Sequence, residues 1–368
     1  MPEVEMVNHF STKKKLLLGI LMTFLLASIL LALAEGGVRV RAWFKYGSAR
    51  HFESLYYFDN DLKLKYPIAN YTTRTIRINS RGFRGPELDD HKDPNSVRLA
   101  FLGGSTTFCA EVSGNDQVWP HLVWKRIQVD FPKTKFDYIN GGVPGYTLSS
   151  SLKNLQHRIA PLKPDVIVIY HATNDLSGET RDIAKKMGLY KEFHTKPSWL
   201  ERQSLLWHLV RKNLQIIQVQ QEVGRGVDRL RTLPDGFGAG FRRELETLIG
   251  EAQKLAKLVV VVTWTQQIRK DQPAEQKLKA AASALYYMPF MTPESLLEAY
   301  QLYNQGIREV AHRTGALLVE GENSIPGDDT HFNDTVHFKD AGSHAMAERI
   351  NRVLLKSDAF RDLIEAKK

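Results

Sequence analysis

Five short apolar runs, separated by longer segments with helical periodicity, constrain the fold of this 368-residue chain more than any other feature. Two of the runs, 165–170 and 258–263, are almost wholly apolar, as expected for strands that are covered on both faces. Alternating strands and helices predict crossover units, and therefore an α/β fold with a parallel sheet between two layers of helices. The predicted strands are 97–102, 135–139, 165–170, 258–263 and 316–320, and the predicted helices are 116–130, 148–160, 240–256, 294–313 and 340–356.

A serine follows the first apolar run directly. The segment 97–108 reads VRLAFLGGSTTF, so Gly103 and Gly104 end the predicted strand and Ser105 begins the next turn. Ligands of open α/β sheets bind beyond the carboxyl ends of the strands, where a following helix presents unpaired N–H groups. The hydroxyl of Ser105 therefore stands where a nucleophile belongs, although Gly-Gly-Ser-Thr alone is more often a plain turn that starts a helix.

The amino-terminal region contains a segment suited to a membrane. Residues 16–34 carry no charge and follow three lysines. At about 1.5 Å per residue, a helix of this length nearly matches a hydrocarbon core of about 30 Å. A signal peptide cleaved near Ala34 is the alternative and would give a secreted protein, but the run is long for a signal peptide. Basic residues flank both ends and do not decide the orientation. We predict the orientation that is common for a single amino-terminal anchor, with the amino terminus inside and the rest extracytoplasmic.

Charge and cysteine content exclude several classes of protein. The formal net charge is +9, from 50 Lys and Arg against 41 Asp and Glu, yet no run of five like charges occurs. We therefore predict no nucleic-acid partner. The single cysteine, Cys109, excludes an intrachain disulfide framework.

The remaining segments are arranged around the predicted sheet. Residues 71–78 alternate β-branched with charged side chains, like an edge strand or hairpin arm in a cap. Two insertions follow predicted strand ends; they are expected to form a substrate pocket or lid, with a helix at 204–223, although their aromatic and methionine residues suit core packing equally well. The predicted organisation is a tail (1–15), a transmembrane helix or signal anchor (16–34), a juxtamembrane segment and cap (35–96), a catalytic domain (97–358) with insertions 177–238 and 265–293, and a carboxy-terminal tail (359–368).

Three further motifs carry side chains or backbone groups suited to acyl transfer. The glycine-rich segment 140–147 follows the second predicted strand and Asn174 follows the third, where an N–H group can face the same pocket. A tight turn and a helix cap are the plain alternatives for these two places. Near the end of the chain, Asp334 and His337 are spaced so that both side chains can project from one face of a turn, as a general base and its orienting carboxylate require. The nearby His331 and His344 fit no strong zinc pattern, so we predict no metal site.

Taken in chain order, these motifs resemble those of the SGNH (GDSL-type) hydrolases over most of 97–350. The resemblance implies a flavodoxin-like three-layer sandwich with a five-stranded parallel sheet. It also implies that Ser105 is the nucleophile, that Gly145 and Asn174 bind the oxyanion, and that Asp334 and His337 complete the triad. Gly104 stands where many members carry Asp, and the Gly-Gly-Ser-Thr form is similar to a bacterial subgroup with an amino-terminal membrane segment.

These observations lead us to expect a membrane-anchored serine esterase that works through an acyl-enzyme on Ser105 and needs no cofactor. The expected substrate is a small acyl ester, or an acylated glycan or lipid, and the expected membrane contact is 16–34. If a sugar hydroxyl replaces water, the same acyl-enzyme makes the protein an O-acyltransferase or O-acetyltransferase acting on a polysaccharide or other cell-envelope glycan. A binding protein on a degenerate version of the fold is the third alternative.

Overall fold

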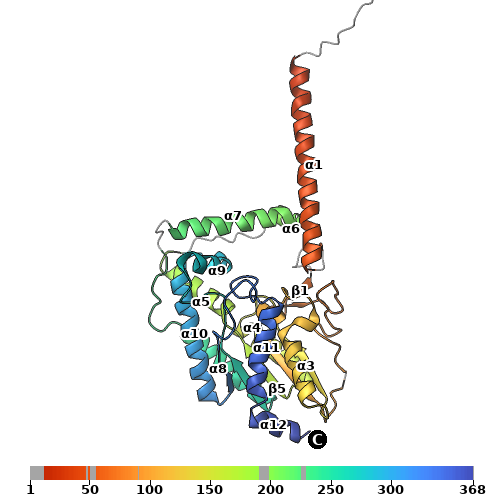
Figure 1. The fold of residues 1–368 in the computed structure, drawn as a ribbon, viewed down its shortest axis with the longest axis vertical. Coiled ribbons are helices and arrows are strands. Elements are labelled where there is room, and N and C mark those ends of the chain that lie inside the picture. Colours follow the sequence, from red (N-terminus) through yellow and green to blue (C-terminus); the bar gives the residue numbers. More distant parts are fainter. Residues whose placement is uncertain are drawn as a thin grey trace, which may run out of the picture.

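A five-stranded parallel sheet forms the centre of the protein, as the sequence predicts (Figure 1). The structure is a computed structural model, and it describes residues 12–46, 49, 55–89, 91–189, 199–224 and 229–367. The strand order is β4-β3-β5-β6-β7, so β3, the first strand of this sheet along the chain, lies second in it, which is the flavodoxin-like order. The strands are β3 (Val97–Gly103), β4 (Phe136–Asn140), β5 (Val166–Tyr170), β6 (Leu258–Val262) and β7 (Leu317–Val319).

Helices cover both faces of this sheet and make it the middle of three layers. On one face α3 (Trp119–Asp130) packs against α11 (Asp340–Leu354). On the other face α8 (Ala239–Leu255) packs between α4 (Leu148–Asn154) and α10 (Pro293–Thr314). All residues of β3, β5 and β6 are buried, which explains why their sequences are continuous apolar runs rather than alternating ones.

The helix predicted at 148–160 is divided in the structure. After α4 the chain widens into a π-helical turn (Leu155–Ile159) and then tightens into a 3₁₀ turn (Ala160–Leu162). Pro161 explains the end of the helix, because proline lacks the N–H group that an α-helix needs there. Lys163 then takes a left-handed conformation, with φ of 54°, and leads into β5.

Several helices are missing from the sequence-based assignment, and two of them are longer than a single turn or two. One is α5 (Thr173–Lys186), which begins directly after β5. The other is α12 (Asp358–Glu365), which occupies most of the predicted carboxy-terminal tail. The assignment of 359–368 to a tail is wrong, because Phe360, Leu363 and Ile364 of this helix are buried in the main core.

The segment before the sheet also differs from its predicted form. It contains an antiparallel hairpin of β1 (Tyr56–Asp59) and β2 (Leu64–Pro67). No strand forms at 71–78; only isolated bridges pair Thr72 with Arg77 and Ile78 with Arg84. The Thr73 hydroxyl accepts hydrogen bonds from the N–H groups two and three residues later, so the chain turns back before a ladder can extend.

The amino-terminal helix α1 (Thr12–Tyr46) projects from the rest of the molecule (Figure 1). It extends beyond the predicted span 16–34, and its stretch Lys14–Phe44 is long and apolar enough to cross a membrane by length and composition. Near its base lie α6 (Trp199–Gln203) and α7 (Leu205–Gly224), and α7 matches the helix predicted at 204–223. The second insertion forms α9 (Ala274–Tyr287), which packs against α7.

Candidate active site

Ser105 begins a one-turn helix at the carboxyl end of β3. This helix, α2 (Ser105–Phe108), follows the strand after a single intervening residue, Gly104. A Cβ atom on Gly104 would lie 2.8 Å from Nδ2 of Asn174, so a larger residue would displace the amide from the serine turn. The glycine thus permits the close approach of two segments that carry predicted site residues.

His337 and Asp334 lie beside this serine and form a continuous chain of hydrogen-bonding groups with it. Nε2 of His337 is 2.7 Å from Oγ of Ser105, although 232 residues separate the two in the chain. Nδ1 of His337 is 2.9 Å from each carboxylate oxygen of Asp334. The order of hydroxyl, imidazole and carboxylate is that of a serine hydrolase triad.

The turn that carries Asp334 and His337 is organised locally. Oδ1 of Asp334 accepts hydrogen bonds from the N–H groups of Val336 and His337, both at 3.0 Å. These bonds form an Asx turn, in which an aspartate side chain replaces part of a backbone turn. The spacing of the Asp-x-x-His motif therefore orients the carboxylate toward the imidazole without help from the rest of the fold.

Thr335 fixes this turn to the second insertion. Its hydroxyl donates to the carbonyl of Ala280 at 2.7 Å and accepts from the hydroxyl of Ser283 at 2.9 Å, both in α9. Its carbonyl accepts the N–H of Gln267 at 2.7 Å. The insertion 265–293 therefore supports the imidazole. The methionine and phenylalanine residues that end this insertion are buried in the core, as core packing requires: Met288, Phe290 and Met291.

The pKa values of the pair follow from opposing effects. Burial alone would lower the pKa of His337, but the carboxylates of Asp334 and Glu111 outweigh burial and raise it to about 9. Burial also opposes the ionisation of Asp334, yet the charge of His337 and the two backbone N–H groups hold its pKa well below the usual range. The interaction within the pair therefore favours a protonated imidazole next to an ionised carboxylate.

The sequence analysis missed Glu111. Its carboxylate interacts electrostatically with His337 and Asp334, and its buried Oε2 has no hydrogen-bond partner among the described residues. Burial raises the pKa of Glu111, and the positive charges of His337 and Arg84 partly offset this rise. Nothing in the local sequence marks this glutamate, because only the fold brings it near the imidazole.

Arg84 is a second missed residue, and it binds the end of the helix that begins with Ser105. This buried side chain lies in the segment 68–96 that links β2 to β3, here called the lead-in. It donates through Nη1 to the carbonyl of Phe108, the last residue of α2, at 2.9 Å. It also donates through Nη2 to the carbonyl of Thr75 and through Nε to Oδ1 of Asn115, each at 2.9 Å. The guanidinium thus ties the lead-in and the loop after α2 to the end of the serine helix.

The two predicted oxyanion residues are held together by side chains at the start of α5. Nδ2 of Asn174 donates to the carbonyl of Tyr146 at 2.8 Å, and Oδ1 of Asp175 accepts the N–H of Leu148 at 2.9 Å. These bonds clamp the loop that contains Gly145, which has a φ of +87° and is exposed. The structure therefore places Asn174 beside the serine turn and Gly145 in the loop that Asn174 contacts.

The other histidines near the triad make separate contacts. Nδ1 of His331 lies 2.8 Å from Oδ1 of Asp328, and Nε2 of His344 lies 2.9 Å from Oε1 of Gln117. Within the described parts of the chain, no three His, Cys, Asp or Glu side chains gather into a group that could hold a metal ion.

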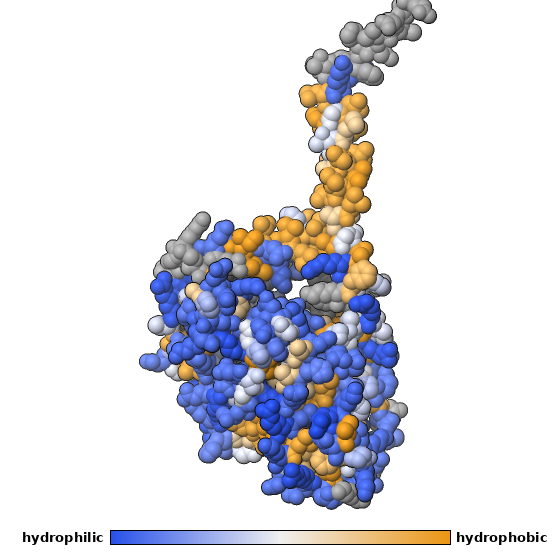
Figure 2. Space-filling view, in the orientation of Figure 1, coloured by the Kyte–Doolittle hydropathy of each residue, from blue (hydrophilic) through white to orange (hydrophobic). Residues whose placement is uncertain are grey.

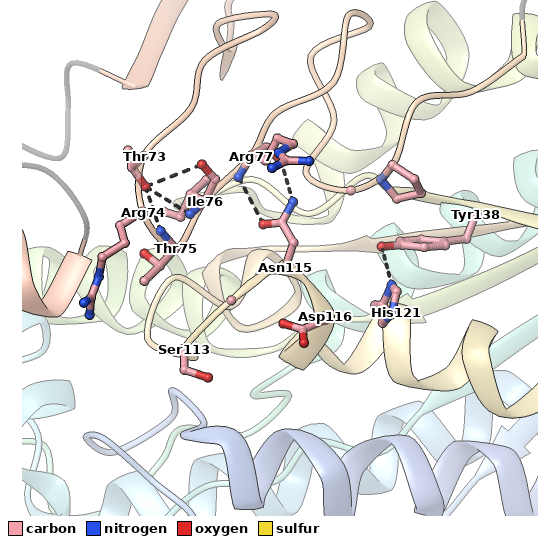
Figure 3. Close-up of a pocket in the computed structure, with 13 residues that line it drawn as sticks. Thr73, Arg74, Thr75, Ile76, Arg77, Ser113, Asn115, Asp116, His121 and Tyr138 are labelled. Atoms are coloured by element: carbon pink, nitrogen blue, oxygen red, sulfur yellow. Dashed lines mark hydrogen bonds between the residues drawn. The ribbon is translucent and has the colours of Figure 1, made fainter.

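A separate hollow of about 460 Å³ lies between the lead-in and the loop after α2 (Figure 3). Asn115 bonds to both backbone groups of Arg77 at its wall, and the hydroxyl of Tyr138 faces Nδ1 of His121 at 3.4 Å. None of Ser105, Asp334 and His337 lines this hollow, so it is not the space in front of the nucleophile.

Comparison with known proteins identifies the family. The family model described as GDSL-like lipase/acylhydrolase matches residues 101–345, which is more than half of the chain. The protein belongs to this family. It is therefore a hydrolase that acts on carboxylic ester bonds, and the matched range includes every predicted site residue of this acylhydrolase. A search of curated proteins found no match.

Several solved structures are similar to this acylhydrolase in fold. An acetylxylan esterase from Geobacillus stearothermophilus shares 15% identity at a TM-score of 0.43, covering 73% of this chain and 98% of its own. A lipase/acylhydrolase from Enterococcus faecalis shares 18% identity at a TM-score of 0.41, covering 70% of this chain and 94% of its own.

Proposed function

We propose that the protein is a membrane-anchored serine esterase that forms an acyl-enzyme on Ser105. The observation that carries this proposal is the hydrogen-bonded sequence of Ser105, His337 and Asp334 at the carboxyl edge of the sheet. Oγ of Ser105 attacks the ester carbonyl while Nε2 of His337 takes its proton, and Asp334 stabilises the imidazolium that results. His337 then protonates the leaving alcohol, and water attacks the acyl group in a second, equivalent step.

The negative charge that develops on the carbonyl oxygen of the substrate must be stabilised by hydrogen-bond donors. The N–H groups of Ser105 and Gly145 and the amide of Asn174 are the proposed set. One N–H of the Asn174 amide bonds to the Tyr146 carbonyl, and this bond orients the amide. The second N–H has no partner among the described residues and is the one assigned to the oxyanion.

Covalent labelling tests this mechanism directly. A fluorophosphonate probe should modify the parent protein and fail to modify Ser105→Ala, which should also lose hydrolysis of p-nitrophenyl acetate. Ser149→Ala is the matched control, because this serine is exposed on α4 and is given no role. Hydrolysis by Ser105→Ala at the parent rate would remove the proposal. Product analysis with an added sugar acceptor separates hydrolysis from acyl transfer.

Membrane anchoring through α1 is the second part of the proposal, with the catalytic domain on the extracytoplasmic side. The apolar side chains of 16–34 are exposed along the whole stretch, for example Leu16 at 67% and Phe24 at 72%. Side chains of this kind require a nonpolar environment, which a bilayer supplies. The full chain should resist extraction from membranes by alkaline carbonate, and a protease added outside the cell should reach the catalytic domain. If mass spectrometry of the mature protein gives the mass expected without residues 1–34, the segment is a cleaved signal peptide instead.

A further inference from the structure

The helix α7 exposes a row of large apolar side chains along one side. The exposed fractions are 44% for Trp207, 39% for Val210, 61% for Leu214 and 48% for Ile217. Steps of three and four residues place these four side chains on a single face of the helix. The preceding α6 adds Trp199, at 68%, and Leu200, at 45%. A contiguous apolar surface of this kind marks an interaction site.

The start of α7 is hydrogen-bonded to α1 at Glu35, just after the apolar run. The carboxylate of Glu35 accepts the N–H groups of Leu205 and Leu206 at 3.0 and 2.9 Å, and the hydroxyl of Ser204 at 2.8 Å. Glu35 thus caps the first turn of α7, where unpaired N–H groups favour a negative charge. Nη2 of Arg39 adds a bond of 2.8 Å to the carbonyl of Gln203. Because Glu35 directly follows the apolar run 16–34, α7 starts where that run ends.

From this junction α7 extends to the side of α1 and across the top of the body (Figure 1). If α1 crosses a bilayer along its normal, α7 therefore extends along the membrane surface. The apolar surface of α1 continues onto α7, whereas the visible face of the body below is mainly hydrophilic (Figure 2). The position of α7 at the end of the apolar run, its direction and its apolar surface are thus all those expected of a helix that lies on a membrane.

The other side of α7 faces the body and is mixed in character, with Leu205, Leu209 and Ile216 half-buried there together with Lys212. Arg211 forms an ion pair with Glu201 of α6, and Nζ of Lys212 lies 5.8 Å from the ring centroid of Tyr286 in α9. The charge of Lys212 also acts to lower the pKa of His337, so α7 lies within electrostatic reach of the triad. The helix therefore has one side that packs on the catalytic domain and another on which large apolar side chains remain exposed in the described structure.

We propose that the apolar face of α6 and α7 is embedded in the layer between lipid headgroups and acyl chains of the bilayer that α1 spans. This inference rests on the proposed membrane anchoring. Helices that lie in this layer present an apolar face with large side chains and bury it by about 5–10 Å. Tryptophan is favoured there, because its ring is apolar and its N–H group is polar. The catalytic domain is then held against the membrane by α7, with α9 directly beneath. The face is defined by Trp199, Leu200, Trp207, Val210, Leu214 and Ile217.

Site-specific labelling in a bilayer tests this contact. The full chain is placed in phospholipid nanodiscs, and an environment-sensitive NBD fluorophore is attached to Leu214→Cys. The native Cys109 does not compete, because it is buried and burial raises its pKa to about 12. The matched control is Val129→Cys in α3, because Val129 is 66% exposed. Val129 is two residues from Phe131, which contacts Phe360 of α12. The helix α12 lies at the end of the body opposite α1 (Figure 1). Unchanged circular dichroism shows that each variant is folded.

The label at Leu214 should emit at shorter wavelength and lose intensity when doxyl-labelled lipids are included, whereas the label at Val129 should do neither. If both labels emit as in water while the chain resists carbonate extraction, the inference about α7 is wrong and the anchor stands. A shielded Leu214 label that doxyl lipids do not quench overturns the inference in favour of a protein partner or a second copy. Extraction of the chain by carbonate overturns the anchor and the inference together.

Discussion

Replacing Asp334 by Asn should change the pH dependence of catalysis as well as its rate. The general base must be unprotonated, so kcat/KM of the parent should rise with pH until the imidazole of His337 has lost its proton. The pKa of His337 is raised from 6.5 to about 9 against the effect of burial. The parent should therefore be most active in alkaline solution and should lose activity as the pH falls through about 9.

The size of the expected change follows from the same balance. Without the Asp334 carboxylate, burial opposes only the more weakly acting Glu111, so the pKa of His337 should fall toward or below 6.5. The acid limb of the profile should thus move down by about two pH units or more, equivalent to roughly 3 kcal/mol. The plateau value of kcat should fall by about 10³ to 10⁴, because an amide neither fixes the tautomer nor stabilises the imidazolium.

The assay is kcat/KM for p-nitrophenyl acetate between about pH 5 and about pH 10, corrected for spontaneous hydrolysis. The chain supplies its own control in Asp328, which contacts His331 through Nδ1 at 2.8 Å and accepts the N–H groups of Thr330 and His331. Asp328→Asn should leave both the limb and the plateau unchanged. An Asp334→Asn variant with the acid limb of the parent, or a shift of equal size in Asp328→Asn, would refute the assigned roles.

Three further substitutions test neighbouring groups. Asn174→Ala should lower kcat by about 10² to 10³ with little change in KM, measured with the same ester, because its amide is assigned to the oxyanion. Glu111→Gln should move the acid limb down, by less than Asp334→Asn does, because the Glu111 carboxylate acts to raise the pKa of His337. Burial raises the pKa of Asp175 from 3.8 to about 7, so this carboxyl destabilises the folded state increasingly as the pH rises through that interval. Asp175→Asn keeps an acceptor for Leu148 and should therefore be more stable by a few kcal/mol near pH 8, with a smaller gain near pH 5, in urea denaturation.

The elements of the sheet were predictable because their signal is local. A strand that is buried on both faces must be apolar throughout, and the runs in β5 and β6 satisfy this condition without reference to other parts of the chain. The helix α12 carries no such signal in the sequence, because eight residues contain too few turns to establish a period. Its apolar side chains indicate a helix only once the core against which they pack is known.

The residues around the site also fall into those that a local sequence signal predicts and those that it does not. Ser105 and Gly145 stand in glycine-rich turns after predicted strands, so their placement follows from the rule that parallel strands end at one edge of a sheet. Glu111 and Arg84 follow from no such rule. Arg84 donates to Phe108 of α2, to Asn115 and to Thr75, and a single sequence does not show which acceptors a buried guanidinium will find.

The two Asp-x-x-His segments of this chain separate what local sequence determines from what the fold adds. In both, an aspartate oxygen accepts backbone N–H groups two and three residues later and faces Nδ1 of the histidine. The spacing alone thus produces an oriented Asp–His pair twice. Only the pair of Asp334 and His337 is fixed through Thr335 to α9 and has a serine hydroxyl at 2.7 Å from Nε2. The motif therefore supplies an oriented imidazole, and the end of β3 decides which of the two histidines faces a serine hydroxyl.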